Sequence, residues 1–227
     1  MRFFLFFLFF STFSNISSQV NTAEYSLKNG ESIMYFDADW NIITEKSKAE
    51  FYRIFKLGAN NQSEGEVKDY FKTGQIQNSL ERASYIDIND DDKWIFEGLS
   101  VVYFDSGEIE EEYNYINNKK EGKKKVYYKS GKIKSIENYE NGIANGKYIS
   151  FYESGLTYIE YESINGNIEG DWIAYRENGK IEQTVSYVND KKEGILKDFN
   201  ESGELNFVIK YYKGEKLTDE AFYPSGS

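Results

Sequence analysis

The chain has 227 residues, with 38 Asp plus Glu against 27 Lys plus Arg, and it contains neither histidine nor cysteine. Without cysteine, no disulfide, thiolate zinc site or lipidated cysteine can form, and without histidine the usual proton shuttle near neutral pH is missing. The acidic balance argues against nucleic acid and anionic membranes as partners, because nonspecific binding to both depends on cationic patches.

Residues 1–18 have the pattern of a secretory signal peptide. Arg2 is followed by an apolar run from Phe3 to Phe10 and then by small polar residues. This run is too short for a membrane-spanning helix, which needs about 20 apolar residues. We therefore expect cleavage after Ser18, leaving Gln19 first, and export to the periplasm, the cell envelope or the medium. The alternatives are an uncleaved anchor and a buried N-terminal strand.

Residues 19–64 are predicted to form an N-terminal capping region with a degenerate repeat. Residues 33–36 and 51–55 are rich in β-forming side chains, and a turn at 37–39 follows the first run. A single helical turn is expected within residues 46–50. Terminal repeats are typically irregular because they must cap an open end.

After this region the chain repeats itself every 24 residues. One register of glycines comprises Gly98, Gly122, Gly146, Gly170 and Gly194. A second register comprises Gly107, Gly131, Gly155, Gly179 and Gly203. Five positions after each glycine of the first register stands an aromatic residue: Tyr103, Tyr127, Phe151, Tyr175 and Phe199. Two glycines and an aromatic residue in phase over five units predict a repeat architecture.

An earlier unit begins at Gly65, with Tyr70 five positions and Gly74 nine positions later. Gly65 and Gly98 are 33 residues apart, so this unit carries nine extra residues, which we place in the acidic segment 86–93. A partial unit ends near Gly226. The predicted repeat domain is therefore 65–227, with units starting near residues 65, 98, 122, 146, 170 and 194.

Each unit is predicted to contain two short strands and two turns. In the unit that starts at Gly170, we expect strands at 171–176 and 181–187, joined by a turn at 177–179. A small polar residue followed by glycine suits a tight hairpin, because glycine adopts a positive φ without strain. The predicted turn glycines are Gly74, Gly107, Gly131, Gly155, Gly179 and Gly203. The second turn falls on Asn118, Gly142, Gly166, Asp190 and Gly214.

The second strands alternate between apolar and polar residues. Ile181, Val185 and Tyr187 fall on one face of the predicted strand, with Thr184 and Ser186 on the other. This period of two indicates half-buried strands and no helix. The predicted fold class is all-β: an elongated, twisted antiparallel meander of ~24-residue β-hairpin repeats in one open-ended sheet.

Units such as GKYISFYESG at 146–155 and GDWIAYRENGKI at 170–181 resemble the bacterial variant of the MORN repeat. Proteins built from this variant form the YwqK-type family, labelled as antitoxin components of toxin–antitoxin systems. The resemblance covers about residues 65–226, and more loosely 33–57. It implies a curved antiparallel sheet, a role in protein interaction and no shared catalytic residues. The chain departs from the pattern at Ser100, Lys124 and Leu196, where Trp or Tyr is common.

The residues do not form a constellation for catalysis. Carboxylates are abundant, but they fall on polar faces or in turns, so we predict no catalytic residue, no cofactor, no metal site and no enzyme. The acidic segment with Asp87, Asn89, Asp91 and Asp92 partly matches a calcium loop. It lacks the Gly at the sixth place and the Glu at the twelfth, so a solvated loop and a calcium site are both considered.

The candidate interaction face consists of Tyr103, Tyr127, Phe151, Trp172, Tyr175 and Phe199. These rings either bind a partner or cover their own sheet. We expect a monomeric, exported repeat protein that binds another protein along its sheet, with a basic surface on that partner. The alternative is an antitoxin or immunity protein that neutralises a cognate toxin. An enzyme acting on cell-surface polysaccharide is the third class considered.

Overall fold

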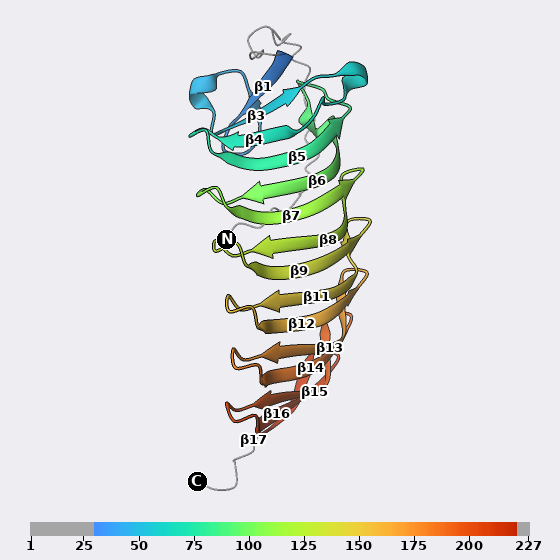
Figure 1. The fold of residues 1–227 in the computed structure, drawn as a ribbon. Helices are drawn as coiled ribbons and strands as arrows, with labels where there is room; N and C mark the ends of the chain where they lie inside the picture. The colour runs from blue at the N-terminus through green and yellow to red at the C-terminus, as the bar shows by residue number, and fades with distance from the viewer. Residues whose placement is uncertain (1–29, 222–227) are drawn as a thin grey trace.

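The computed structural model describes residues 30–221, which form one stack of antiparallel strands (Figure 1). The predicted signal peptide at 1–18 and the end of the partial unit near Gly226 lie outside the described residues. Within 30–221 all 17 strands belong to a single sheet. The predicted fold class is therefore confirmed.

The head, defined here as residues 30–94, contains the first strands and three short 3-10 turns. The strands are β1 (Glu31–Phe36), β2 (Ile42–Ile43), β3 (Phe51–Lys56), β4 (Val67–Phe71) and β5 (Ile76–Ser84). The 3-10 turns are η3 (Lys46–Lys48), η4 (Ala59–Asn61) and η5 (Asp91–Lys93). Both β-rich runs predicted in this region are strands, and η3 lies where a helical turn was expected.

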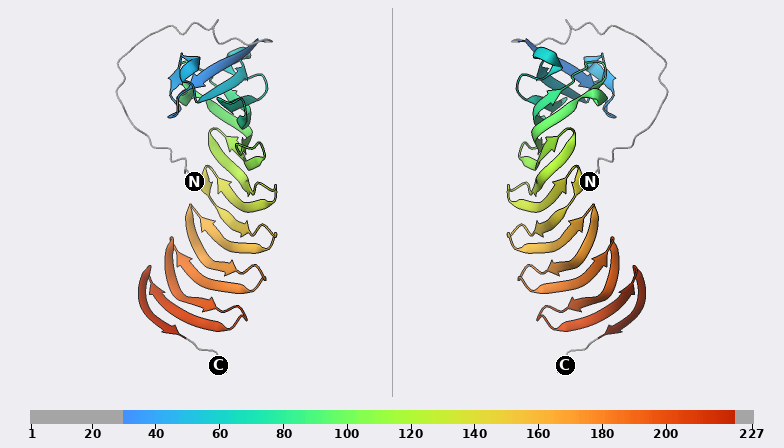
Figure 2. Two further views of the ribbon diagram at one scale, coloured as in Figure 1. Left: turned by 90° about the vertical axis from the view of Figure 1, so that its left-hand side faces the viewer. Right: turned by 90° about the vertical axis from the view of Figure 1, so that its right-hand side faces the viewer.

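The remaining strands form the repeats, in which each strand pairs with its neighbours along the chain (Figure 2). Their order begins with β6 (Ile95–Tyr103), β7 (Ile109–Ile116), β8 (Lys119–Tyr127), β9 (Ile133–Glu140), β10 (Ile143–Ala144) and β11 (Gly146–Phe151). It continues with β12 (Thr157–Ile164), β13 (Asn167–Tyr175), β14 (Ile181–Val188), β15 (Lys191–Phe199), β16 (Leu205–Tyr212) and β17 (Glu215–Ala221). Because β10 is short, β9 pairs with both β10 and β11.

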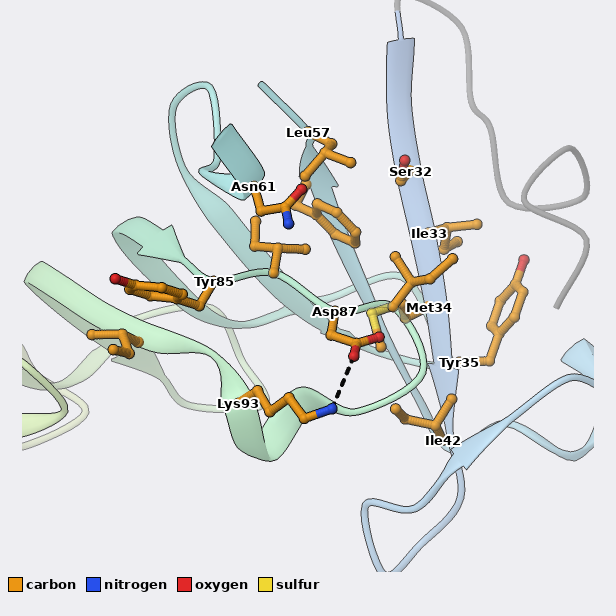
Figure 3. Close-up of a pocket in the computed structure, with 14 residues that line it drawn as sticks. Ser32, Ile33, Met34, Tyr35, Ile42, Leu57, Asn61, Tyr85, Asp87 and Lys93 are labelled. Carbon is orange, nitrogen blue, oxygen red and sulfur yellow. Dashed lines mark hydrogen bonds and ion pairs between the residues drawn. The ribbon is translucent and has the colours of Figure 1, made fainter. Parts of the chain in front are cut away.

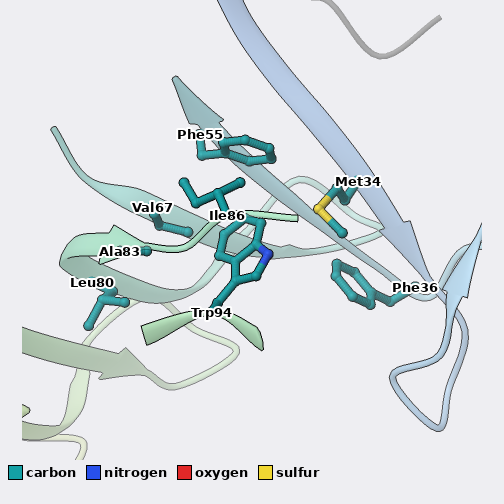
Figure 4. Packing of buried hydrophobic residues seen from close by; sticks show 8 residues of the cluster. All are labelled: Met34, Phe36, Phe55, Val67, Leu80, Ala83, Ile86 and Trp94. Atoms are coloured by element: carbon teal, nitrogen blue, oxygen red, sulfur yellow. The ribbon is translucent and has the colours of Figure 1, made fainter. Parts of the chain in front are cut away.

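The main hydrophobic core lies in the head (Figure 4). Its buried members are Met34, Phe36, Phe55, Val67, Leu80, Ala83, Ile86 and Trp94. Trp94 is 1% exposed, and its indole Nε1 donates a hydrogen bond of 2.9 Å to the backbone oxygen of Asp87. The extra segment 86–93 is therefore attached to the core by apolar anchors at both ends. The predicted boundary between residues 64 and 65 passes through this core.

The six predicted turn glycines all have a positive φ, between 80° and 98°. In the turn of Gly179, the glycine N–H donates to Arg176 O at 2.9 Å and the Arg176 N–H donates to Lys180 O at 2.8 Å. This is a three-residue hairpin loop whose last residue is left-handed, a position that favours glycine. The six glycines therefore lie in turns in which a positive φ is required.

The opposite end of each hairpin is a two-residue loop. Both central residues have a positive φ, as in the type I′ turn that matches the twist of paired strands. The loops are Asn117–Asn118, Asn141–Gly142, Asn165–Gly166, Asn189–Asp190 and Lys213–Gly214. The second residue of each loop has a φ between 61° and 89°, as its residue type predicts.

Each of these loops is also bonded to the preceding unit. The Asn189 N–H donates to the Glu169 carboxylate at 2.9 Å, and the Lys213 N–H donates to the Glu193 carboxylate at 2.7 Å. The same contact recurs along the stack with the acceptors Glu97, Glu121, Asn145, Glu169 and Glu193. The side chain before each first-register glycine therefore links one unit to the next.

The first-register glycines were expected to stand just before the first strand of each unit. Four of the five instead lie inside strands. Gly170 has a φ of 72° within β13, which begins at Asn167 and not at 171. Glu160 pairs with Ile173 and Glu162 pairs with Glu169. An interval of two residues in β12 therefore lies opposite an interval of four residues in β13. Gly170 therefore lies at a bulge, where a left-handed residue lets the strand continue on both sides.

Candidate functional site

The pairing register assigns each side chain to one of the two faces of the sheet. Directly paired residues share a face, and neighbours along a strand point to opposite faces. Trp172 in β13 pairs with Val185 in β14, and Tyr148 in β11 pairs with Tyr161 in β12. Ile159 in β12 pairs with Ala174 in β13, which connects these two pairs. These residues lie on the same face, here called face A. The same register places the core of the head on face A, and the opposite side is face B.

Face A of the repeats carries a series of half-buried aromatic side chains. They are Tyr113, Tyr115, Tyr139, Tyr148, Tyr161, Trp172, Tyr187 and Tyr211. Smaller buried residues, such as Ser100, Ser150 and Ala174, lie among them. Within residues 96–221 the strands form one layer, and no second layer of the described chain covers this face (Figure 2).

The aromatic side chains of face A contact one another and three lysines, Lys120, Lys124 and Lys192. The rings of Tyr148 and Tyr161 stack with centroids 4.5 Å apart. The Lys120 Nζ lies 4.4 Å from the Tyr113 ring centroid and 5.4 Å from that of Tyr139, which is cation–π geometry. Lys120 therefore lies against the aromatic series, and burial lowers its pKa.

The hydroxyls of Tyr113, Tyr139 and Tyr161 on face A stay protonated over the physiological range. Burial raises the pKa of Tyr161 to about 12. Burial also raises the pKa of Tyr113 and of Tyr139 well above the ordinary value, and in Tyr139 a hydrogen bond of 2.8 Å to Glu137 adds to the effect. A neutral hydroxyl can donate a hydrogen bond, so face A combines apolar rings with polar donors.

Face B is more strongly charged. Lys125 Nζ lies 2.6 Å from the Glu112 carboxylate, which also accepts a hydrogen bond of 2.7 Å from the Tyr127 hydroxyl. Glu160 makes the same two kinds of contact, with Lys147 and Tyr175. The hydrogen bonds from the lysines are the main reason that the pKa of Glu112 and that of Glu160 are lowered.

The six aromatic residues proposed from the sequence as one interaction face are not on one surface. Tyr175 follows Trp172 by three positions in β13, and its hydroxyl bonds Glu160 of face B, so the two point to opposite faces. Trp172 lies on face A, whereas Tyr103, Tyr127, Phe151, Tyr175 and Phe199 lie on face B. Sequence reasoning passed over the face A tyrosines of the second strands. Their signal was present, because Tyr115, Tyr139, Tyr187 and Tyr211 are in the 24-residue register.

A groove of about 930 Å³ lies in the head, between β1 and the segment 85–95 (Figure 3). Its walls are mainly apolar, with Ile33 and Met34 from β1 and Ile86 and Ile88 from the facing segment. Leu57, just after β3, lines the groove and is 43% exposed. The groove lies apart from the aromatic series of the repeats.

Beside this groove, a buried arginine joins the extra segment to the sheet. Arg53 Nε lies 2.7 Å from Asp69 Oδ1, and a second guanidinium nitrogen lies 3.2 Å from Asp69 Oδ2. A third nitrogen lies 3.4 Å from Asp91 Oδ2, and the guanidinium also lies 5.0 Å from the Trp94 ring centroid. Burial raises the pKa of Asp91 despite the attraction of Arg53. This pairing satisfies a cation that would be costly to bury alone.

Three of the four carboxylates in the acidic segment pair with cations of the chain. Lys93 Nζ lies 3.1 Å from Asp87 and 3.0 Å from Asp90, and Asp91 pairs with Arg53. Among residues 30–221, no group of three or more acidic side chains is arranged to hold a metal ion. The segment is thus a loop held largely by ion pairs.

Comparison with known proteins supports the repeat assignment. The MORN repeat variant matches residues 96–117, 120–141 and 168–189, which correspond to the hairpins β6–β7, β8–β9 and β13–β14. The chain is thus a repeat protein with MORN-variant units, as the resemblance implied, and the narrower YwqK-type label stays a prediction. Among residues 30–221, no helix is long and apolar enough to span a bilayer.

No curated protein matches the chain. Among solved structures, the chain is similar to one described as "Crystal structure of GtfA/B complex bound to UDP and GlcNAc". The sequence identity is 13%, the match covers 50% of this chain and 22% of that one, and the TM-score is 0.23. A likeness of this size carries no argument about function.

Proposed function

We propose that the protein is an exported, non-enzymatic repeat protein that binds another protein along face A of the repeats. The observation that supports this most directly is the uncovered aromatic series on that face. A single layer of sheet leaves half-buried rings such as Trp172 and Tyr187 accessible from one side. Tyrosine and tryptophan are enriched in protein interfaces because they combine large contact areas with polar groups.

The charge distribution suits a partner with apolar residues at the centre of its surface and basic residues at the rim. On face A, Lys124 is neutralised by Glu111 at 2.9 Å. The whole chain carries a formal charge of −11. Attraction between this negative charge and a basic partner acts at long range, so it accelerates association and weakens as salt screens it.

Export is proposed from the pattern of residues 1–18 and has its own test. The natively expressed protein should begin near Gln19 when its N-terminus is sequenced from an envelope or extracellular fraction. An intact Met1 on membrane-free native protein would contradict export without touching the proposal for face A.

The role of face A can be tested with two single substitutions. Tyr187→Ala removes a half-buried ring of face A, and Ile195→Ala removes an exposed side chain of face B. The partner is first identified by cross-linking native protein in its compartment, and its affinity for each purified variant is then measured. We expect Tyr187→Ala to weaken binding by about fivefold or more, as an interface aromatic does, and Ile195→Ala to have little effect.

A deletion tests whether the contacts extend over several units. Removal of residues 146–169 takes out one 24-residue period and should leave a shorter folded sheet, because each unit contacts only its neighbours. Binding should weaken while circular dichroism still reports β structure. Equal affinity of Tyr187→Ala, Ile195→Ala and unmodified protein would contradict binding through face A.

A further inference from the structure

One edge of the head lacks a pairing strand over part of its length. β1 pairs with β3 from Glu31 to Phe36, whereas on its other edge β2 pairs only with Tyr35 and Phe36. Among residues 30–221, no strand lies along the outer edge of residues 31–34. An open edge of this kind is a template for an extended segment of another protein. The open length is about 13 Å, which matches about four residues of such a segment.

The apolar groove of the head lies directly beside this edge. Residues 32–34 line one side of it, and the segment 85–95 lines the other (Figure 3). Leu57 is 43% exposed and Tyr85 is 68% exposed, so both place apolar surface at the rim of the groove. A volume of about 930 Å³ is large enough to hold several side chains of an added strand.

The rim of the groove is held in a fixed conformation by the chain itself. Tyr85 has a φ of 56°, which is a strained conformation for a residue with a β-carbon. Strain of this kind persists only where the surrounding structure holds it, and it is common at sites that hold ligands. Here the N–H of Ile86 donates to the backbone oxygen of Asn61 at 3.0 Å, and Asn61 also lines the groove. A rim that is ordered before binding lowers the entropy cost of holding a ligand.

Both sides of the groove carry an excess of negative charge. Asp87 and Asp90 share a single cation, because Lys93 Nζ lies 3.1 Å from the first and 3.0 Å from the second. Glu31 and Asp92 are exposed, and each is adjacent in sequence to a residue that lines the groove. Neither has an ion-pair partner within the part of the chain that the structure describes. A ligand with basic groups beside its apolar ones therefore complements the groove.

We propose that the head binds an extended segment of a partner protein as an added strand on the open edge of β1. The segment has apolar side chains at alternate positions and basic residues at both ends. One set of its alternate side chains enters the groove, and the other set points to solvent. Backbone hydrogen bonds to β1 provide affinity, whereas the apolar groove and the acidic residues beside it provide selectivity. This site is separate from face A and does not rest on the function proposed for that face.

Peptide binding to the natively produced protein tests strand addition. The probe is a fluorescently labelled peptide of sequence Lys-Val-Thr-Val-Thr-Val-Lys, and its affinity is measured by fluorescence anisotropy at low salt. Only alternate N–H groups of an added strand face the edge to which it is bonded. N-methylation of one alternate set, the valines or the threonines, should therefore weaken binding at least about tenfold, and N-methylation of the other set should change it less than about twofold. Exchange of both lysines for glutamates should also weaken binding at least about tenfold.

Two uncharged substitutions locate the peptide on the protein. Leu57→Ser removes apolar surface from the rim of the groove, and Leu99→Ser removes a side chain of similar exposure, 41%, on face B. The first should weaken binding of the lysine peptide by about fivefold or more, and the second should leave it within about twofold. Equal affinity of the two variants, or no measurable binding to the unmodified protein, would overturn the proposal. Equal affinity of both N-methylated peptides would also overturn it, because the groove would then hold apolar ligands without strand pairing.

Discussion

Gly179→Val isolates the conformational contribution of a single turn. Gly179 has a φ of 81°, and a β-carbon added there would meet no atom within 4 Å. A clash therefore contributes nothing, and the cost is that of holding a β-branched residue in the left-handed region, about 1–3 kcal/mol. Gly179→Asn should cost less than about 1 kcal/mol, because asparagine tolerates this conformation.

The two variants can be compared by urea unfolding monitored with circular dichroism. The change from Gly to Val should also lower the Tm by about 2–4 °C per kcal/mol in a chain of this size. Glu177→Gln, an exposed change in the same turn, serves as the control and should stay within about 0.5 kcal/mol of the unmodified protein. If Asn costs as much as Val, or if Val costs no more than the control, backbone strain is not what selects glycine at this turn.

Arg53→Leu should cost about 3–5 kcal/mol in urea unfolding because it leaves Asp69 buried without its cation, and adding Asp69→Leu should recover most of this loss. Glu169→Ala should cost about 0.5–1.5 kcal/mol, since an exposed acceptor of one backbone bond is lost. The hydrogen bond to Glu160 and burial raise the pKa of Tyr175 to about 12. Its stabilising contribution is complete below about pH 10 and falls as the pH rises through 12; a phenolate absorbance titration in which every tyrosine ionises near pH 10 would contradict this.

The repeat period and both kinds of turn could be predicted because they depend on local chemistry. Glycine, asparagine and aspartate at fixed spacings determine where a positive φ is accessible, and no tertiary contact is needed to recognise them. Gly131 and Gly142 illustrate this, since both lie in turns with the expected φ. The antiparallel meander could be predicted from these turns, because a short turn joins two strands that are antiparallel neighbours.

The distribution of side chains between the two faces was harder to predict. Alternation within one strand shows which of its residues share a face, but not which face of the sheet that is. Trp172 and Tyr175 were grouped by their positions in the repeat and not by their alternation within β13. The bulge at Gly170 was missed because a left-handed glycine within a strand has the same sequence signal as one in a turn.

The head depends on contacts between residues far apart in the sequence. Arg53 meets Asp69 and Asp91 only after β3, β4 and the extra segment have come together. Trp94 was not distinguished from other aromatic residues, although it is the most buried of the three tryptophans in the described chain. No local pattern identifies such a pair in advance, because burial is decided by which segments cover one another.

The strands run across the long axis of the stack, and this has a mechanical consequence. Tension applied between the head and β17 would act along the hydrogen bonds that join successive strands, so these bonds would be loaded one after another. Shearing strands in parallel would require many bonds to break together, whereas this geometry lets them open singly. Under tension the protein would therefore lengthen in steps of one hairpin, from the β17 end, and the head with its packed core would open last.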